Sequence, residues 1–365
     1  RSTEGAKMPA GKVTEKRSPG GRVGPDIQTN STITWKSTKR RPLAVPANSP
    51  GFSSGTGSNT FAQGSEWVPK SGTNSPIEDL FPRPVRNVVE AQIALARMGI
   101  SSGSVDGRLG PQTRMAIEAF QKLHQLPETG QLDPSTRAAL VLSHPPFSQY
   151  TLTPSDLNRL QPLSKTWAGK AQQTVLDYET VLELVSERAR AHPQFLRHLN
   201  PPEVFDSPGA GTTVIVPDTE LEETMPCEFI RISLSRRTLE ACDSQSNLVA
   251  HFPCSIAQRV EKRPAGELHV IALAPNPNYT FDPDLFPESA EARELSGKLV
   301  LPSGPNNPVG VAWIGLDQPG YGIHGTPSPE QVGRTESHGC IRLANWNAEH
   351  LLKIIRMGMP VYVEP

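Results

Sequence analysis

One short stretch of the chain contains a cysteine and two histidines: His324 comes first, and His338 and Cys340 follow after a polar loop. A thiol attacks a carbonyl carbon only as the thiolate, so it needs a base or a cation beside it. In an extended segment His338 would share a face with Cys340, and a loop over residues 327–336 would bring His324 back to the sulfur. We therefore predict that Cys340 is the nucleophile of an acyl transfer, with either histidine as its base.

The residues around the cysteine fit the same chemistry. Gly339 has no Cβ, so the backbone N–H groups of Gly339 and Cys340 can approach a developing oxyanion. Asn345 or Asn347 would cap the following helix, whose N-terminus would favour the thiolate. A metal site is the main rival, but no carboxylate or further cysteine has the spacing of a fourth ligand, so we expect no metal.

The region that must position these residues has the sequence pattern of a β-domain. Apolar and polar residues alternate over residues 229–234, and further strand-like runs with turns between them follow. Those runs cover residues 248–254, 268–273, 309–316 and 361–363, and helical patterns occur near residues 287–296 and 344–356. Many short strands with few helices predict a mainly-β catalytic domain, a sandwich or partial barrel, over residues 226–365.

The remainder of the chain divides by composition. Residues 1–84 are rich in Pro, Gly and Ser without an apolar period, and predict a disordered tail. Residues 85–142 predict a small all-α unit of three helices, in which a glycine-rich turn contains Asp106 and the third helix has Asp133 as N-cap. Residues 143–225 predict a helical linker, with an amphipathic helix over residues 175–191 and a short strand over residues 214–217.

The last domain resembles the L,D-transpeptidase (YkuD) catalytic domain. That family has a histidine, a spacer, and then Ser/Thr-His-Gly-Cys followed by an apolar residue and Arg or Asn; here these are His324, the loop, and Ser-His-Gly-Cys340-Ile-Arg342. Residues 304–310 and 358–361 match further parts of the family pattern. Arg263 departs from the threonine that is usual at its position, in a turn.

Two weaker resemblances lie upstream. Residues 85–142 resemble the peptidoglycan-binding domain 1 family through Gln92-x-x-Leu95, the turn Asp106-Gly107-x-x-Gly110-x-x-Thr113, and Phe120-Gln121. Residues 143–225 look like a degenerate LysM glycan-binding unit, because Leu-Asn-Pro and Val-Ile-Val-Pro strings end it. A plain helical spacer remains the alternative for that segment.

The resemblance to the transpeptidases assigns site roles. Cys340 would be the nucleophile and His324 the proton donor and acceptor. The other residues would shape the oxyanion hole or hold the histidine and substrate: His338, Gly339 and Ser337 in the first group, and Arg342, Tyr279, Gly325 and Thr326 in the second. Arg342 would bind a substrate carboxylate or form a structural ion pair, and Tyr279 would line the cleft or fill it. No metal or organic cofactor is implied.

The implied reaction is an L,D-transpeptidation. The cysteine would form a thioester with a peptidoglycan tetrapeptide stem, release D-Ala, and pass the acyl group to an amine for 3→3 crosslinking or protein anchoring. An L,D-carboxypeptidase, another amidase-type hydrolase and a non-catalytic peptidoglycan-binding protein remain alternatives. Such a role belongs to cell-wall biogenesis and cell shape.

Bulk properties restrict partners and compartment. The net charge is −1, which gives no field for nucleic acid, and no apolar run reaches the ~18 residues of a membrane span. Residue 1 is Arg, so either a signal peptide was removed or the chain was cut for another reason. Because the implied substrate lies outside the cytoplasm, we expect a removed export signal and a monomer in the periplasm or cell wall. In that oxidising setting we expect a disulfide between Cys242 and Cys254, with Cys227 as the third candidate.

Overall fold

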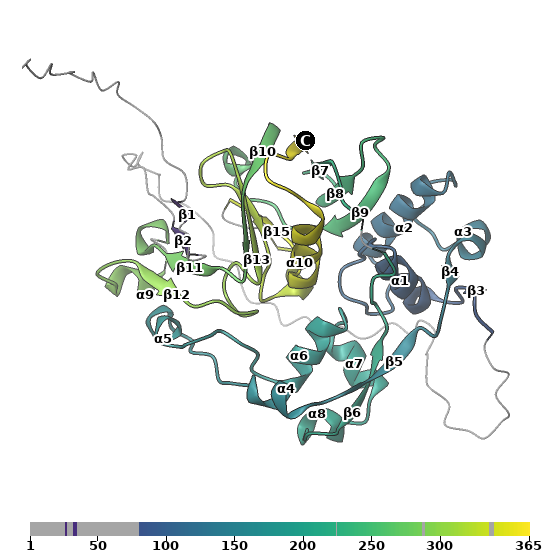
Figure 1. The fold of residues 1–365 in the computed structure, drawn as a ribbon, viewed down its shortest axis with the longest axis horizontal. Coiled ribbons are helices and arrows are strands. Elements are labelled where there is room, and N and C mark those ends of the chain that lie inside the picture. Colours follow the sequence, from purple (N-terminus) through teal and green to yellow (C-terminus); the bar gives the residue numbers. More distant parts are fainter. Residues whose placement is uncertain (1–25, 28–31, 35–79, 224, 287–288, 336–338) are drawn as a thin grey trace, which may run out of the picture.

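The computed structural model describes residues 26–27, 32–34, 80–223, 225–286, 289–335 and 339–365. Figure 1 shows three parts: a helical module, a central β-sheet with a helix against it, and a middle module that runs beneath both. Of the predicted site residues, Ser337 and His338 lie outside the described residues. So does most of the tail predicted over residues 1–84, whose disorder stays a prediction.

The helical module has the three predicted helices. They are α1 (Val88–Arg97), α2 (Pro111–Leu123) and α3 (Pro134–Ala139). The Asp133 side chain accepts a hydrogen bond from the Thr136 N–H, which confirms the predicted cap. The short strands β3 (Arg83–Pro84) and β4 (Val141–Leu142) pair antiparallel and bring the two ends of the module together.

A buried glutamine organises the glycine-rich turn of this module. Gln92 Nε2 donates to Asp106 Oδ1 at 2.9 Å and to Thr113 Oγ1 at 3.0 Å, and Gln92 Oε1 accepts from the Gly107 N–H at 2.8 Å. Asp106 Oδ1 also accepts from the Arg108 N–H at 2.9 Å, which is the expected Asx turn. The residues that carry the resemblance to the peptidoglycan-binding family therefore hold the module's fold.

The middle module is a two-stranded sheet that encloses a set of helices. Strands β5 (Phe147–Thr151) and β6 (Thr213–Pro217) pair antiparallel. Between them lie α4 (Pro154–Asn158), α5 (Trp167–Ala171), α6 (Val181–Arg188), α7 (Pro193–Leu199) and α8 (Glu203–Asp206). The β6 strand confirms the expected one.

The helix predicted over residues 175–191 is shorter than expected, so its first part was wrong. Thr180 is the N-cap, and its side chain accepts from the Glu183 N–H at 3.1 Å. Before it, the backbone of Leu176 pairs with another domain: its N–H donates to Ser303 O at 2.9 Å. These contacts leave the preceding residues outside the helix despite their apolar spacing.

The domain predicted over residues 226–365 is built on one eight-stranded sheet with the order β15-β14-β13-β10-β16-β7-β8-β9. The strands are β7 (Phe229–Ser233), β8 (Thr238–Cys242), β9 (Leu248–Pro253), β10 (Gly266–Pro275), β13 (Ala312–Leu316), β14 (Gly322–His324), β15 (Ile341–Arg342) and β16 (Pro360–Glu364). Helix α10 (Asn345–Ile354) packs against the sheet (Figure 1). The domain is mainly β, as predicted.

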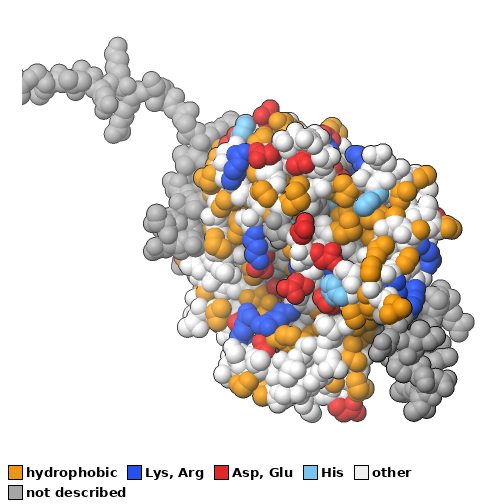
Figure 2. Space-filling view, turned by 45° about the vertical axis from the view of Figure 1, so that its right-hand side comes forward, with side chains coloured by type: hydrophobic (Ala, Val, Ile, Leu, Met, Phe, Trp, Pro, Cys, Tyr) orange, Lys and Arg blue, Asp and Glu red, His pale blue; other side chains and the backbone are white. Residues whose placement is uncertain are grey.

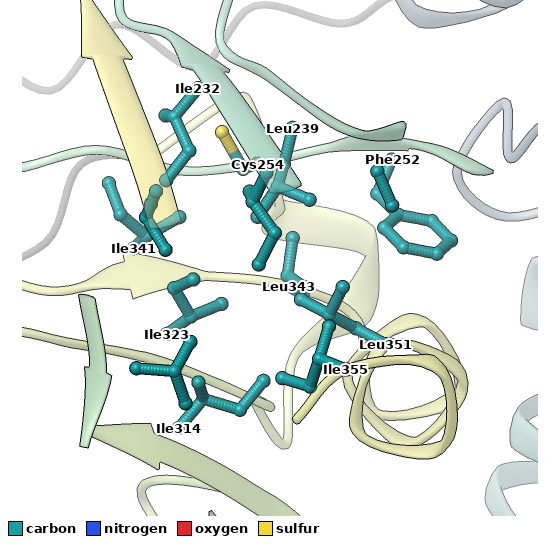
Figure 3. Close-up of a cluster of buried hydrophobic side chains, with 14 of the residues drawn as sticks. Ile232, Leu239, Phe252, Cys254, Ile314, Ile323, Ile341, Leu343, Leu351 and Ile355 are labelled. Carbon is teal, nitrogen blue, oxygen red and sulfur yellow. The ribbon is translucent and has the colours of Figure 1, made fainter. Parts of the chain in front are cut away.

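A buried apolar cluster lies between the sheet and α10. Figure 3 shows Ile314, Ile323 and Ile341 from three neighbouring strands pointing into it, together with Leu351 of the helix. All four are at most 1% exposed. Burial of such side chains stabilises a fold by about 1.5–3 kcal/mol each, so β14 and the edge strand β15 are held by their inward residues.

A second, smaller sheet lies beside this one. Its order is β1 (Asp26–Ile27), β2 (Thr32–Thr34), β11 (Asn278–Phe281) and β12 (Leu299–Leu301). Helix α9 (Ala290–Glu294) connects β11 with β12, and short 3₁₀ turns occupy Val260–Lys262, Pro283–Leu285 and Pro329–Gln331. Tyr279 lies on β11, opposite Leu301.

The expected disulfide between Cys242 and Cys254 is wrong. All four cysteines are free and buried. Strands β8 and β9 form a hairpin in which Cys242 pairs with Leu248 at one end, whereas Cys254 follows Pro253 at the other. Cys242 instead lies near Cys227, because the N–H of Glu228, the residue after Cys227, donates to Cys242 O at 2.7 Å.

The charge on the surface and the length of the helices agree with the overall composition. Figure 2 shows Lys and Arg side chains interspersed with Asp and Glu on the visible face, in keeping with the net charge of −1. Within the part of the chain that the structure describes, no helix has the length and apolar character needed to span a membrane.

Candidate active site

The predicted catalytic residues come together through the register of three neighbouring strands. Trp313 on β13 pairs with His324 on β14, and His324 pairs in parallel with Arg342 on β15. Since Ile323 and Ile341 point into the core (Figure 3), His324 and Arg342 face the opposite side of the sheet. Cys340 comes directly before β15 and lies in a buried cluster with Trp313.

His324 is held as a neutral base. Its Nδ1 donates to the Gly325 carbonyl oxygen at 2.6 Å, so Nε2 carries the free lone pair. The ring stacks on Trp313, with centroids 5.8 Å apart and planes at 20°. Burial, with a smaller contribution from the charge of Arg342, lowers the pKa of His324 to about 4. At neutral pH the imidazole can therefore accept a proton.

Cys340 is a protonated thiol in this arrangement. The side chain is 8% exposed, and its Sγ lies 3.8 Å from Gly320 O. Burial raises the pKa of Cys340 to about 12, while the Gly322 backbone and the Arg342 charge act in the opposite direction. A thiol in this state can act as a nucleophile only with a base that takes its proton during the attack, because little thiolate is present at rest.

Arg342 is placed where its charge acts on both groups. Its backbone exchanges two hydrogen bonds of 2.9 Å with Ser255, which fixes the strand that follows the cysteine. Burial lowers the pKa of Arg342, and the Cys340 charge raises it. A guanidinium in this position stabilises the thiolate form of the cysteine.

The other predicted residues divide between the site and its surroundings. Gly325 receives the imidazole hydrogen bond, and Thr326 is buried beside it with its Oγ1 accepting from the Ser328 N–H at 3.3 Å. Tyr279 is 7% exposed in the same cluster as Cys340, and burial raises the pKa of its phenol. Among the described residues other than its chain neighbour Cys340, none lies within 4 Å of the position that a Cβ on Gly339 would take.

Two asparagines near the site have roles that the sequence reasoning missed. Neither caps α10, whose N-cap is Ala344 without a side-chain hydrogen bond. Asn345 Nδ2 instead donates to both carboxylate oxygens of Glu187 in the middle module, each at 3.1 Å. Asn347 Nδ2 donates to Ser101 Oγ in the helical module at 3.1 Å. The sequence shows only that two asparagines lie at the start of a predicted helix. It does not show that both are buried.

Two buried histidines make the domain sensitive to acid. Burial lowers the pKa of both His324 and His350 from 6.5 to about 4. The unfolded chain then binds more protons between these values, so the free energy of unfolding should fall by about 2 kcal/mol per histidine as pH drops from 6.5 to 4. Chemical denaturation at several pH values, with and without His350→Gln, measures the effect.

The His350→Gln variant isolates one of the two contributions, since His350 lies away from the cysteine on α10. We expect it to lose less stability than the wild type over this pH range. Glu187 acts with the opposite sign because burial raises its pKa from 4.5 to about 7. Equal losses in the two proteins would contradict the burial of a neutral His350.

Comparison with known families matches two segments of the chain to family models. The family model of the "L,D-transpeptidase catalytic domain" (YkuD) matches residues 228–363. The model named "Putative peptidoglycan binding domain" (PG_binding_1) matches residues 85–140. The match to the first model contains His324 and Cys340, and that to the second contains Gln92 and Asp106.

Individual relatives have the same assignment. The chain is 28% identical over 184 residues to "Putative L,D-transpeptidase YkuD" of Bacillus licheniformis, covering 50% of this chain and 93% of that protein. It is 36% identical over 105 residues to "Putative L,D-transpeptidase YqjB" of Bacillus subtilis, covering 27% and 51%. A solved structure, L,D-transpeptidase 3 from Mycobacterium tuberculosis with a faropenem-derived adduct, aligns at TM-score 0.30 and 18% identity, covering 43% and 75%. Residues 228–363 therefore match the L,D-transpeptidase catalytic domain (YkuD), and residues 85–140 match a putative peptidoglycan-binding domain.

Proposed function

We propose that this protein is an L,D-transpeptidase in which Cys340 forms a thioester with a peptidoglycan tetrapeptide stem. The observation that supports this most is the register that pairs His324 with Arg342 and starts β15 at the residue after Cys340. It gives a thiol, a neutral imidazole with a free Nε2 and a guanidinium on one face of the sheet, which are the groups that acyl transfer through a thioester requires.

The reaction runs in two halves. His324 Nε2 takes the thiol proton as Sγ attacks the carbonyl carbon of the third, diamino acid residue of the stem. The C–N bond to D-Ala breaks, and the imidazolium returns its proton to the leaving amine. An acceptor amine then attacks the thioester, His324 takes its proton, and the thiolate leaves and is reprotonated. The acceptor is a neighbouring stem in 3→3 crosslinking, or an amine of a protein.

The tetrahedral intermediate carries a negative oxygen that needs donors. We assign this role to the backbone N–H groups of Gly339 and Cys340, with His338 and Ser337 shaping the segment. The space beside Gly339 in which a Cβ would meet no other atom supports access from that side. Arg342 favours the thiolate as leaving group and binds a substrate carboxylate, and Tyr279 borders the cleft.

The setting follows from the substrate. Peptidoglycan lies outside the cytoplasm, so we place the protein in the periplasm or cell wall, as a monomer bound to the wall through its residues 85–142. We assign residues 143–225 as a degenerate LysM-like unit, because β5 and β6 pair antiparallel around α6 and α7. Binding of each segment to purified peptidoglycan tests this part of the proposal.

Covalent labelling tests the nucleophile. After incubation with a carbapenem, intact mass spectrometry should show one adduct, which peptide mapping places on Cys340. The Cys340→Ala variant should show none, and Cys242→Ala, which removes another buried thiol, should be labelled as the wild type is. An adduct on another residue, or no adduct on the wild type, would contradict the assignment.

Incubation with purified muropeptides, with and without an added amine, separates the transpeptidase from its alternatives. Crosslinked dimers or amine-exchanged stems indicate transpeptidation, and stems that are only shortened indicate the L,D-carboxypeptidase. Unchanged muropeptides beside a labelled Cys340 would contradict both reactions and favour a binding protein.

A further inference from the structure

We propose that Glu187, in the middle module, is a positioning residue for the catalytic His324 and acts on it through Asn345. The inference rests on the proposed function and deepens it. It makes the middle module part of the catalytic apparatus, in addition to any role in binding the cell wall. Three successive contacts, which begin in the middle module and end at the imidazole, carry it.

The first contact joins the two modules. Both carboxylate oxygens of Glu187 accept from Asn345 Nδ2 at 3.1 Å, and Glu187 Oε1 also accepts from the Tyr178 hydroxyl at 3.2 Å. Asn345 is 1% exposed, and its Nδ2 donates as well to Pro305 O at 3.1 Å. The amide group is thereby fixed in rotation, because its two N–H bonds have partners in different segments.

The second contact is on the other side of the same amide. Asn345 Oδ1 accepts from the Val311 N–H at 3.3 Å. It also lies so close to Gly310 and Gly325 that a Cβ on either residue would overlap it. An amide rotated or shifted by loss of its Glu187 partner would therefore press on the backbone of Gly325.

The third contact reaches the reacting group. The Gly325 carbonyl oxygen accepts from His324 Nδ1, and the Gly325 N–H donates to Ala312 O at 3.2 Å. Since the Nδ1 hydrogen bond fixes both the tautomer and the ring orientation, a shift of Gly325 changes the direction of Nε2. Small displacements of a general base reduce the rate strongly, by up to about 100-fold for 1 Å.

The electrostatics of Glu187 add a pH dependence. Burial, with a smaller contribution from Glu183, raises the pKa of Glu187 to about 7, against the hydrogen bonds from Asn345 and Tyr178 and the charge of Arg159, which act to lower it. Other ionisable groups line the cavities on either side of the carboxylate: Arg188, Arg190, Glu349, His350, Lys353 and Glu330. Protonation removes one of the two acceptors that hold Asn345, so the positioning contact weakens as pH falls through 7.

The pH profile of Cys340 acylation is the direct test. We expect the wild-type rate constant with a carbapenem to fall about fivefold from pH 8 to pH 6. Burial lowers the pKa of His324 to about 4 and raises the pKa of Cys340 to about 12, so neither group changes charge in this range. The Glu187→Gln variant should react about tenfold more slowly than the wild type at pH 8, and its rate should be independent of pH between 6 and 8.

Stability should change in the other direction. Because the pKa of Glu187 is higher in the folded state than its ordinary 4.5, the carboxylate lowers stability as pH rises from about 4.5 to 7. At pH 8 the Glu187→Gln variant should therefore melt no lower than the wild type while it reacts more slowly. A purely structural role would lower melting temperature and rate together.

Two further variants complete the experiment. Glu203→Gln makes the same exchange at an exposed site of the middle module and should match the wild type throughout. Tyr178→Phe removes one hydrogen bond to the carboxylate and should move the midpoint of the wild-type transition to higher pH. The Tyr178→Phe variant therefore tests the role of Glu187 even if the Glu187→Gln protein does not fold.

Outcomes for the inference and for the proposed function differ. A wild type that is acylated at Cys340, with no transition near pH 7 and with equal rates for Glu187→Gln and Glu203→Gln, would overturn the role of Glu187 alone. For a Glu187→Gln protein that does not fold, an unmoved midpoint in Tyr178→Phe does the same. A wild type without an adduct would overturn the proposed function instead.

Discussion

Replacing His324 by glutamine lowers the rate constant for acylation of Cys340 by about 10²–10⁴-fold, the usual contribution of a general base. Glutamine keeps much of the volume but offers no ring nitrogen that can take the thiol proton. The loss is large because burial raises the pKa of Cys340 to about 12, so almost no thiolate exists at pH 7 without a base. The rate of adduct formation with a carbapenem, followed by mass spectrometry, measures it.

The two other histidines of the region serve as comparisons. His350→Gln removes a histidine with the same lowered pKa from a position outside the row of Trp313, His324 and Arg342, and should retain the wild-type rate. His338→Gln should lose less than His324→Gln, since we assign His338 to the oxyanion segment. A larger loss in His338→Gln would make His338 the base and leave His324 as its neighbour.

The proposed catalytic pair, His324 and Cys340, can be singled out in the sequence because its signals are local. Ser-His-Gly-Cys340 is a continuous string, and the runs around β7, β9 and β10 alternate strongly enough to show strands. Caps such as Asp133 are equally local, since the side chain bonds within three residues of itself. In these cases one short segment contains both the cause and the effect.

What the sequence could not show depends on pairing between distant segments. Strands β14 and β15 are too short for a period of two to appear, and their parallel register sets which residue lies across from His324. Asn345 was assigned to a cap on local grounds, yet its partners are Glu187 and Val311. The helix predicted over residues 175–191 failed for the same reason, because Leu176 bonds to Ser303.

These distant contacts show that the modules form one structure. Val105 and Ala191 form an isolated bridge between the helical and middle modules, and Ile100 pairs with His251 of β9. At the far side of the catalytic domain, Trp167 of α5 stacks on Phe281 of β11, with ring centroids 4.3 Å apart. Figure 1 shows α5 beside β12 and α9, so the middle module reaches the strands that carry Tyr279.

Replacing Gly304 by alanine should disrupt the packing of this residue against Leu176 of the middle module and reduce activity sharply. Gly304 has φ of +140°, and a Cβ there would overlap the Leu176 carbonyl group, whose carbon would be 2.6 Å away. The atoms nearest to this Cβ position are all backbone atoms of Leu176, so no flexible side chain can move aside. Overpacking and strain together should lower the free energy of unfolding by about 2–4 kcal/mol. Urea denaturation measures this loss, and acylation of Cys340 reports its effect on the site.

Gly297→Ala is the matched control, because nothing lies within 4 Å of the position its Cβ would take. It should keep the wild-type stability and rate, so a loss confined to Gly304→Ala assigns the effect to the Leu176 contact. Limited proteolysis adds a local readout: cleavage between α5 and α6 should become faster once Leu176 is released from Ser303 and Asn306. If Gly304→Ala retains stability and resists cleavage there, the middle module is attached more loosely than its hydrogen bonds indicate, and its influence on His324 would have to run through Glu187 alone.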